Sequence, residues 1–97
     1  MTLKVAGLRR TSRFAAEFLA ASAEVQEAAE KAVETLMTNP SSRLLRLHPL
    51  KQFGKPSVWK IDVFANHSWQ ITFEMEGDVA KLCRLATHKR IDRDPRE

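Results

Sequence analysis

Two stretches in the second half of the chain decide its fold: residues 58–63 read VWKIDV, and residues 69–75 read WQITFEM. In both stretches apolar and polar side chains alternate with a period of two, which is typical of strands with one face in the core. The first strand is expected to extend to Phe64, and the four residues before the second, 65–68 (ANHS), have the length of a hairpin loop. The pattern therefore predicts a pair of antiparallel strands.

The two faces of this predicted hairpin differ in character. The apolar face should meet the core, and it consists of Trp59, Ile61, Val63, Trp69, Ile71 and Phe73. We expect the polar face to be open or only partly covered, and it consists of Lys60, Asp62, Gln70 and Thr72. A polar sheet face between basic loops suits a nucleic-acid backbone, although any one-sided antiparallel sheet has a polar outer face too.

Further strands extend the pattern on both sides of the hairpin. Residues 44–47 (LLRL) are predicted to form a strand that ends at His48-Pro49, and residues 79–86 a strand that follows a turn at 76–78. The β-branched and apolar residues 2–5 are compatible with a short edge strand. Together these segments describe an antiparallel meander.

The first half of the chain has helical periodicity instead. Apolar residues recur with the 3.6-residue spacing of a helix between residues 23 and 36, and Asn39-Pro40 ends the pattern because proline disfavours the α conformation in the residue before it. Thr11 or Ser12 is a candidate N-cap, and Ser22 is a candidate second N-cap that would divide the stretch into two helices.

The expected fold class follows from this order of elements. We predict an α+β protein in which an N-terminal helical hairpin packs on one face of a small, mainly antiparallel sheet of four or five strands. The helices should occupy about residues 11–39, the sheet about 43–88, and a short polar tail 89–97. The 97 residues are expected to form a single domain.

Composition narrows the classes of function. No apolar run is long enough to span a bilayer and no signal sequence is recognisable, so we expect a cytoplasmic protein without a membrane partner. The net charge is +4, and residues 40–61 carry five bases and no acid. Such a block suits contact with phosphates or with an acidic protein partner. The alternative interpretation is a solvent-exposed face without a binding partner.

Three histidines are the side chains best suited to proton transfer near neutral pH: His48, His67 and His88. Each follows or precedes a predicted strand, and the ends of neighbouring strands can meet in space. Their spacing fits no metal motif, and no glycine-rich phosphate loop is present, so we expect neither a metal nor a cofactor. Cys83 lies in the middle of a strand and is expected to be inert.

The predicted helical hairpin and the motifs that follow it, which together cover about residues 11–93, resemble the RelE/ParE superfamily of toxins from type II toxin–antitoxin systems, in its HigB/YafQ-like branch. Asn39-Pro40 followed by residues 47–51 (LHPLK) is similar to the junction between helices and sheet in that family. The predicted hairpin is similar to its tryptophan-containing strand pair, and residues 86–93 (ATHKRIDR) are similar to its C-terminal motif. The resemblance implies the α+β toxin fold.

The resemblance also implies a function and partners. These toxins cleave mRNA on the ribosome without a metal, by attack of a 2′-hydroxyl on the adjacent phosphate, and they are inhibited by a cognate antitoxin. The implied partners are therefore the antitoxin, the ribosome and mRNA, with operator DNA reached through the antitoxin. On the same fold, a ParE-like inhibitor of DNA gyrase and a catalytically weakened protein that mainly binds its antitoxin are the alternatives.

Site residues follow from the resemblance position by position. His48 and His88 match histidines that act in catalysis in YafQ-like toxins, and Gln70 stands where many members carry a catalytic arginine. The candidates for contact with RNA or phosphate are Lys51, Lys60, Lys89, Arg90 and His67.

Two positions depart from the family pattern. The neutral Gln70 cannot supply the charge of an arginine, and Ile91 stands where related toxins often have a tyrosine. Both departures leave the catalytic activity of the chain open.

Overall fold

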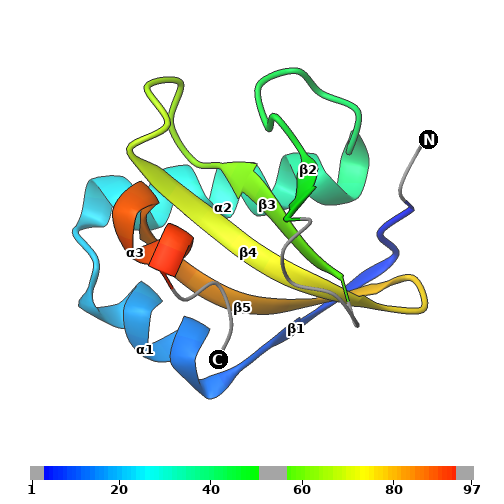
Figure 1. Cartoon of the computed structure of the whole chain (residues 1–97), viewed down its shortest axis with the longest axis horizontal. Helices are drawn as coiled ribbons and strands as arrows, with labels where there is room; N and C mark the ends of the chain where they lie inside the picture. The colour runs from blue at the N-terminus through cyan, green and yellow to red at the C-terminus, as the bar shows by residue number, and fades with distance from the viewer. Residues whose placement is uncertain (1–3, 51–56, 94–97) are drawn as a thin grey trace.

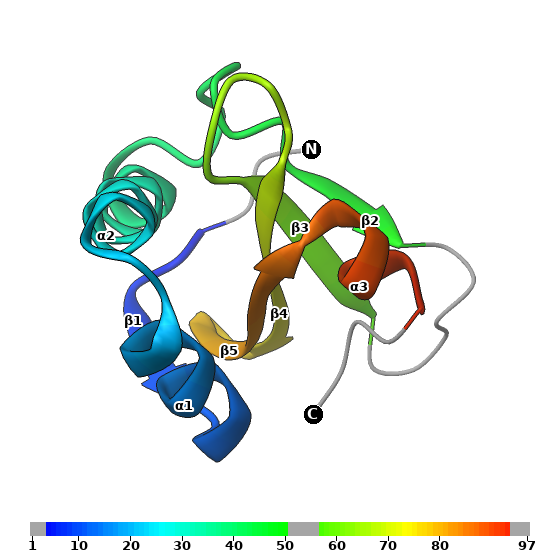
Figure 2. The same cartoon turned by 90° about the vertical axis from the view of Figure 1, so that its left-hand side faces the viewer.

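The computed structural model describes residues 4–50 and 57–93. Its elements follow one another in this order: β1 (Gly7–Arg10), α1 (Ser12–Ala20), α2 (Ala23–Thr38), β2 (His48–Leu50), β3 (Val58–Asp62), β4 (Trp69–Glu76), β5 (Val79–Thr87) and α3 (His88–Arg93). Helices α1 and α2 cover one face of the sheet, and the short α3 lies on the other face (Figures 1 and 2). The predicted α+β architecture is confirmed.

The sheet has five strands in the order β1-β5-β4-β3-β2. Strands β2 to β5 form the expected antiparallel meander, and β1 adds a parallel strand at the edge beside β5. Ile61, Ile71 and Leu85 lie opposite one another on three neighbouring strands, and all three are fully buried beneath the helices. The period-two pattern of β3 and β4 therefore predicted the core face correctly.

Both predicted helix starts are confirmed. The Thr11 hydroxyl accepts a hydrogen bond from the backbone N–H of Phe14 at 3.2 Å, and the Ser22 hydroxyl accepts one from Val25 at 3.3 Å. Helix α2 ends at Thr38, directly before Asn39-Pro40. None of the helices in the described part of the chain is long and apolar enough to cross a membrane.

The predicted strand at residues 44–47 is wrong. Residues 44–46 belong to a turn in which Arg46 has a φ of 48°, a left-handed conformation that strands do not contain. Only Leu45 of its apolar residues is buried, whereas Leu44 is 79% exposed. Strand β2 begins at His48, where the predicted strand ended. It can contain Pro49 because it is an edge strand, in which a residue without an N–H donor is tolerated.

Both ends of the chain also differ from the prediction. The N-terminal edge strand is Gly7–Arg10 rather than residues 2–5, of which 2 and 3 lie outside the described residues. Residues 88–93 form α3 instead of a polar tail, because the fully buried Ile91 packs this turn against the sheet. Residues 94–97 lie outside the described part of the chain.

The polar face of the sheet is partly covered rather than open, which is the second of the two predicted alternatives. Lys60, Asp62, Gln70 and Thr72 are all 6% exposed or less. Helix α3 contacts β4 and β5 on this face, and Arg84 of β5 donates a hydrogen bond to the carbonyl of Arg90 in α3. What remains accessible is a hollow beside α3.

Candidate active site

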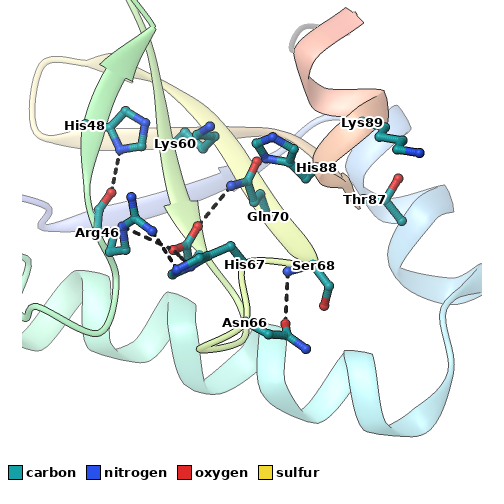
Figure 3. A pocket seen from close by; sticks show the side chains of 11 residues that line it. Arg46, His48, Lys60, Asn66, His67, Ser68, Gln70, Thr87, His88 and Lys89 are labelled. Atoms are coloured by element: carbon teal, nitrogen blue, oxygen red, sulfur yellow. Dashed lines mark hydrogen bonds and ion pairs between the residues drawn. The ribbon is translucent and has the colours of Figure 1, made fainter.

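The hollow has a volume of about 670 Å³ and lies where β2, the β3–β4 loop and the start of α3 meet (Figure 3). Eleven residues line it: Arg46, His48, Lys60, Asp62, Asn66, His67, Ser68, Gln70, Thr87, His88 and Lys89. All three histidines of the chain are among them. The histidines, which are distant in sequence, therefore lie around one hollow together with Arg46, Lys60 and Lys89.

Strand pairing explains why these residues meet. His48 lies directly opposite Lys60 in the β2–β3 pair, and Asp62 lies opposite Gln70 in the β3–β4 pair. The backbone N–H of His88 donates to the carbonyl of Ser68 at 3.1 Å, which joins the start of α3 to the hairpin loop. The hollow is thus built at one end of the sheet from elements that the meander brings together.

Asp62 is the central anion of the hollow, and its side chain is only 2% exposed. Its carboxylate accepts a hydrogen bond from His67 Nδ1 at 2.5 Å and another from Gln70 Nε2 at 3.0 Å. Arg46 Nε completes the group as an ion-pair partner at 3.8 Å. A buried carboxylate with several donors is a rigid support for the side chains around it.

The same contacts fix the proton of His67. Arg46 Nη1 lies 2.6 Å from His67 Nε2, and because a guanidinium only donates, this ring nitrogen must accept. The ring is therefore neutral, with its proton on Nδ1, where it donates to Asp62. Both nitrogens of His67 are engaged within the protein, so this ring is held in place rather than presented to a ligand.

His48 is arranged differently. Its Nδ1 lies 2.7 Å from the carbonyl of Arg46, which can only accept, so Nδ1 carries a proton. The lone pair of the neutral ring is then on Nε2. An imidazole with this tautomer has the free nitrogen that a general base requires.

Gln70 and Lys60 supply the remaining polar groups of the hollow. Because Asp62 accepts from the amide nitrogen of Gln70, the amide oxygen is the atom left over; it is buried and has no hydrogen-bond partner in the structure. Lys60 is 6% exposed, and no hydrogen bond or ion pair joins its ammonium to a described residue. Within the described part of the chain, the hollow therefore holds an ammonium without an ion-pair partner and an unsatisfied acceptor.

The remaining candidates have different positions. Lys89 lines the hollow from the exposed start of α3, whereas Arg90 does not line it and instead borders a separate depression with Glu17 and Trp69. Lys51 lies outside the described residues. Within the described chain, no group of three or more His, Cys, Asp and Glu side chains is arranged to hold a metal ion.

Sequence reasoning missed five of the lining residues: Arg46, Asp62, Asn66, Ser68 and Thr87. Two of these, Arg46 and Asp62, bond to other side chains of the hollow. Asp62 could have been predicted from the sequence, since it shares the polar face of a predicted strand with Lys60. No sequence pattern indicated Arg46, because its role depends on a left-handed turn among residues that were expected to form a strand. Ile91, at the position of the family tyrosine, is fully buried and does not line the hollow.

Comparison with known proteins was informative only at the level of structure. No family model matches the sequence, and no curated protein matches it closely enough to count as a relative. Solved structures do match. YafQ from E. coli has a TM-score of 0.70 at 15% identity, covering 87% of this chain and 94% of YafQ. YafQ in the E. coli DinJ–YafQ toxin–antitoxin complex also has a TM-score of 0.70, at 14% identity, covering 87% and 93%.

Structures from Helicobacter pylori give the same result. A copper-bound mutant toxin has a TM-score of 0.65 at 20% identity over 93% of this chain and 99% of its own. The conserved protein HP0894 has a TM-score of 0.56 at 20% identity, over 91% and 97%. At these identities the likeness concerns the fold. The resemblance of the sequence to RelE/ParE toxins is thus confirmed at that level: the chain has the fold of the YafQ-type toxins.

Proposed function

We propose that the chain is the toxin of a type II toxin–antitoxin system and that it cleaves mRNA on the ribosome without a metal ion. The observation that carries the proposal is the hollow itself, in which His48, His88 and Lys60 converge. Attack of a ribose 2′-oxygen on its own phosphate needs a base, an acid and a cation, and these three residues supply them.

The reaction balances with the groups at hand. His48 Nε2 removes the proton of the 2′-hydroxyl, whose oxygen then forms a bond to phosphorus, and Lys60 stabilises the negative charge of the phosphorane. As the bond from phosphorus to the 5′-oxygen breaks, a protonated His88 donates its proton to that leaving oxygen. The products are a 2′,3′-cyclic phosphate and a 5′-hydroxyl.

Gln70 carries no charge at the position where many related toxins have an arginine. We assign the supply of this positive charge to Lys60. The ammonium of Lys60 lies across the β2–β3 pair from His48, so a positive charge remains beside the base. Gln70 is 2% exposed and its amide nitrogen donates to Asp62. We assign Gln70 to support of the site rather than to the chemical step, because a neutral amide does not stabilise an anionic phosphorane.

The proposed regulatory partner is a cognate antitoxin, and the ribosome and mRNA are the proposed targets in the cytoplasm. YafQ, which shares the fold, has been solved in complex with DinJ as a toxin–antitoxin pair. The cations of the hollow suit RNA phosphates and also acidic residues of an inhibitor. An antitoxin that covers the hollow would therefore block the chemistry directly.

Induced expression tests the proposal. The intact chain should arrest growth, and mapping of RNA 5′ ends should locate new cuts within translated mRNA. His48→Gln and His88→Gln should each lower cleavage by about a hundredfold, because each removes one proton-transfer group. Purified protein should cleave mRNA on programmed ribosomes in the presence of EDTA and leave 2′,3′-cyclic ends.

Arg43→Ala is the matched control, since it removes an exposed base from outside the hollow and should leave cleavage unchanged. Full cleavage by both histidine variants would overturn the proposal. Growth arrest with intact mRNA and impaired supercoiling would instead assign the chain to gyrase inhibition, and harmless expression would assign it to antitoxin binding alone.

A further inference from the structure

Arg46 contacts two histidines of the hollow with two different parts of itself. Its carbonyl accepts the Nδ1 proton of His48 at 2.7 Å, whereas its guanidinium donates to His67 Nε2 at 2.6 Å. The guanidinium also pairs with the buried Asp62 carboxylate at 3.8 Å. One residue therefore connects the candidate base to the anionic support of the hollow (Figure 3).

The backbone of Arg46 has the conformation that makes the first contact possible. Its φ of 48° is in the left-handed region, which a residue with a branched or long side chain adopts rarely and only when its surroundings hold it there. The turn before it is fixed, because Leu45 is buried and its carbonyl accepts from the N–H of Asp62 at 2.7 Å. The contacts of the guanidinium with His67 and Asp62 hold the side chain of Arg46 in place.

His67 has the same unusual backbone, with a φ of 63°. Its Nδ1–H is bound by Asp62, and its N–H donates to the carbonyl of Phe64 at 2.9 Å, so the ring is presented to Arg46 in one orientation. Two left-handed residues from separate loops thus face each other across a hydrogen bond. Strained residues that lock one another in this way are typical of sites whose geometry is part of their function.

We propose that Arg46 is a positioning residue that sets the proton of His48. Its guanidinium, held by His67 and Asp62, keeps its backbone left-handed, and its carbonyl thereby keeps the His48 proton on Nδ1 and the lone pair on Nε2. The catalytic meaning of this arrangement rests on the proposed function, but the arrangement itself does not. It also assigns His67 to positioning rather than to contact with RNA.

Three variants separate the contribution of the Arg46 guanidinium from that of its left-handed backbone. Arg46→Ala removes the guanidinium and disfavours the left-handed backbone, whereas Arg46→Gly removes the guanidinium but adopts that backbone freely. His67→Asn keeps a residue that tolerates the left-handed region and removes the acceptor for Arg46. Arg43→Ala is the control, since it removes another arginine side chain of the same turn that does not line the hollow.

The measurement is the tautomer of His48 by long-range ¹H–¹⁵N NMR at about pH 8, where an imidazole is ordinarily neutral. The intact chain and Arg43→Ala should carry the proton on Nδ1. In Arg46→Ala and His67→Asn the signals should move to the Nε2-protonated form that predominates in free histidine, with Arg46→Gly between the two. Cleavage by Arg46→Ala should fall about tenfold to a hundredfold, in kcat rather than KM.

Two results would overturn the inference: a proton on Nε2 of His48 in the intact chain, or an Nδ1 proton retained in both Arg46→Ala and His67→Asn. If the tautomer shifts as expected but the intact chain cuts no RNA, the proposed function fails and the positioning of His48 by Arg46 stands.

Discussion

Lys60 is the residue whose presence is least explained by stability. The Lys60 residue is only 6% exposed and its side chain lines the hollow, yet its ammonium gains no hydrogen bond or ion pair from the described residues in return for the hydration that it loses. Lysine in the middle of a paired strand also has no advantage in strand propensity over an apolar residue. A cation retained at such a position is expected where a ligand supplies its partner, and a phosphate of RNA is the partner we propose.

Replacing Lys60 by methionine should therefore separate stability from activity. Lys60→Met keeps the length of the side chain, removes the charge and should change the free energy of unfolding by less than about 1 kcal/mol, because no described residue pairs with the ammonium. Cleavage of mRNA should fall by about a hundredfold, because the phosphorane loses its cation. Urea unfolding and a ribosome cleavage assay measure the two effects. A variant that is both less stable and fully active would contradict this assignment.

At the scale of elements, the junction between α1 and β5 depends on one carboxylate. Strand β1 pairs with β5 only as far as Leu82, so the backbone beyond a bulge near Cys83 needs other partners. Glu17 of α1 provides them: it accepts from the N–H of Leu85 at 3.2 Å and pairs with Arg84 Nη2 at 2.6 Å. The Arg84 side chain is only 5% exposed, so this ion pair lies inside the protein.

Glu17→Gln should destabilise the protein by about 3 kcal/mol, because it removes the negative charge from the ion pair with the buried Arg84 guanidinium. The midpoint of urea unfolding should fall while the slope stays constant. Glu27→Gln is the matched control, since Glu27 pairs with Lys31 on the exposed surface of α2 and should contribute less than about 0.5 kcal/mol. Equal effects of the two substitutions would show that the internal pair has no special role.

A second cross-element pair predicts a dependence on pH. Lys81 of β5 binds Glu74 of β4 at 3.1 Å, and this hydrogen bond, with the charge of the carboxylate, raises the pKa of Lys81. A raised pKa stabilises the fold below the pKa of the unfolded lysine, about 10.4, and the contribution disappears as pH rises through the higher folded value. The midpoint temperature of thermal unfolding should therefore fall more steeply above about pH 10 for the intact chain than for Lys81→Met.

On the scale of the whole molecule, regular patterns in the sequence predicted the regular parts of the fold. Alternation along β3 and β4 identified the core face, and two serine or threonine caps located the helices. The errors fall where tertiary contacts override local preference. The buried Ile91 turns an apparently polar tail into α3, and the left-handed Arg46 converts an apolar run into a turn.

The same distinction applies to the site. The histidines could be found from the sequence because they lie at or near the ends of predicted strands, and Lys60 because it lies on the polar face of one of them. The role of Arg46 was not visible, since it depends on a carbonyl direction and a guanidinium contact between separate loops. Hydrogen-bond direction, which identifies His67 as a support and His48 as the candidate base, requires coordinates.

The distribution of charge around the hollow predicts a division between binding and chemistry. Lys89 and Arg90 are exposed on α3 at and beyond the rim of the hollow, whereas His48 and Lys60 lie within it. Lys89→Gln combined with Arg90→Gln should raise KM on programmed ribosomes about tenfold, leave kcat unchanged and reduce the dependence of binding on salt, because fewer phosphate contacts are made. Lys4→Gln with Lys31→Gln, which removes two exposed cations outside the hollow, controls for net charge and should leave KM unchanged. A fall in kcat without a rise in KM would instead place the start of α3 in the chemical step.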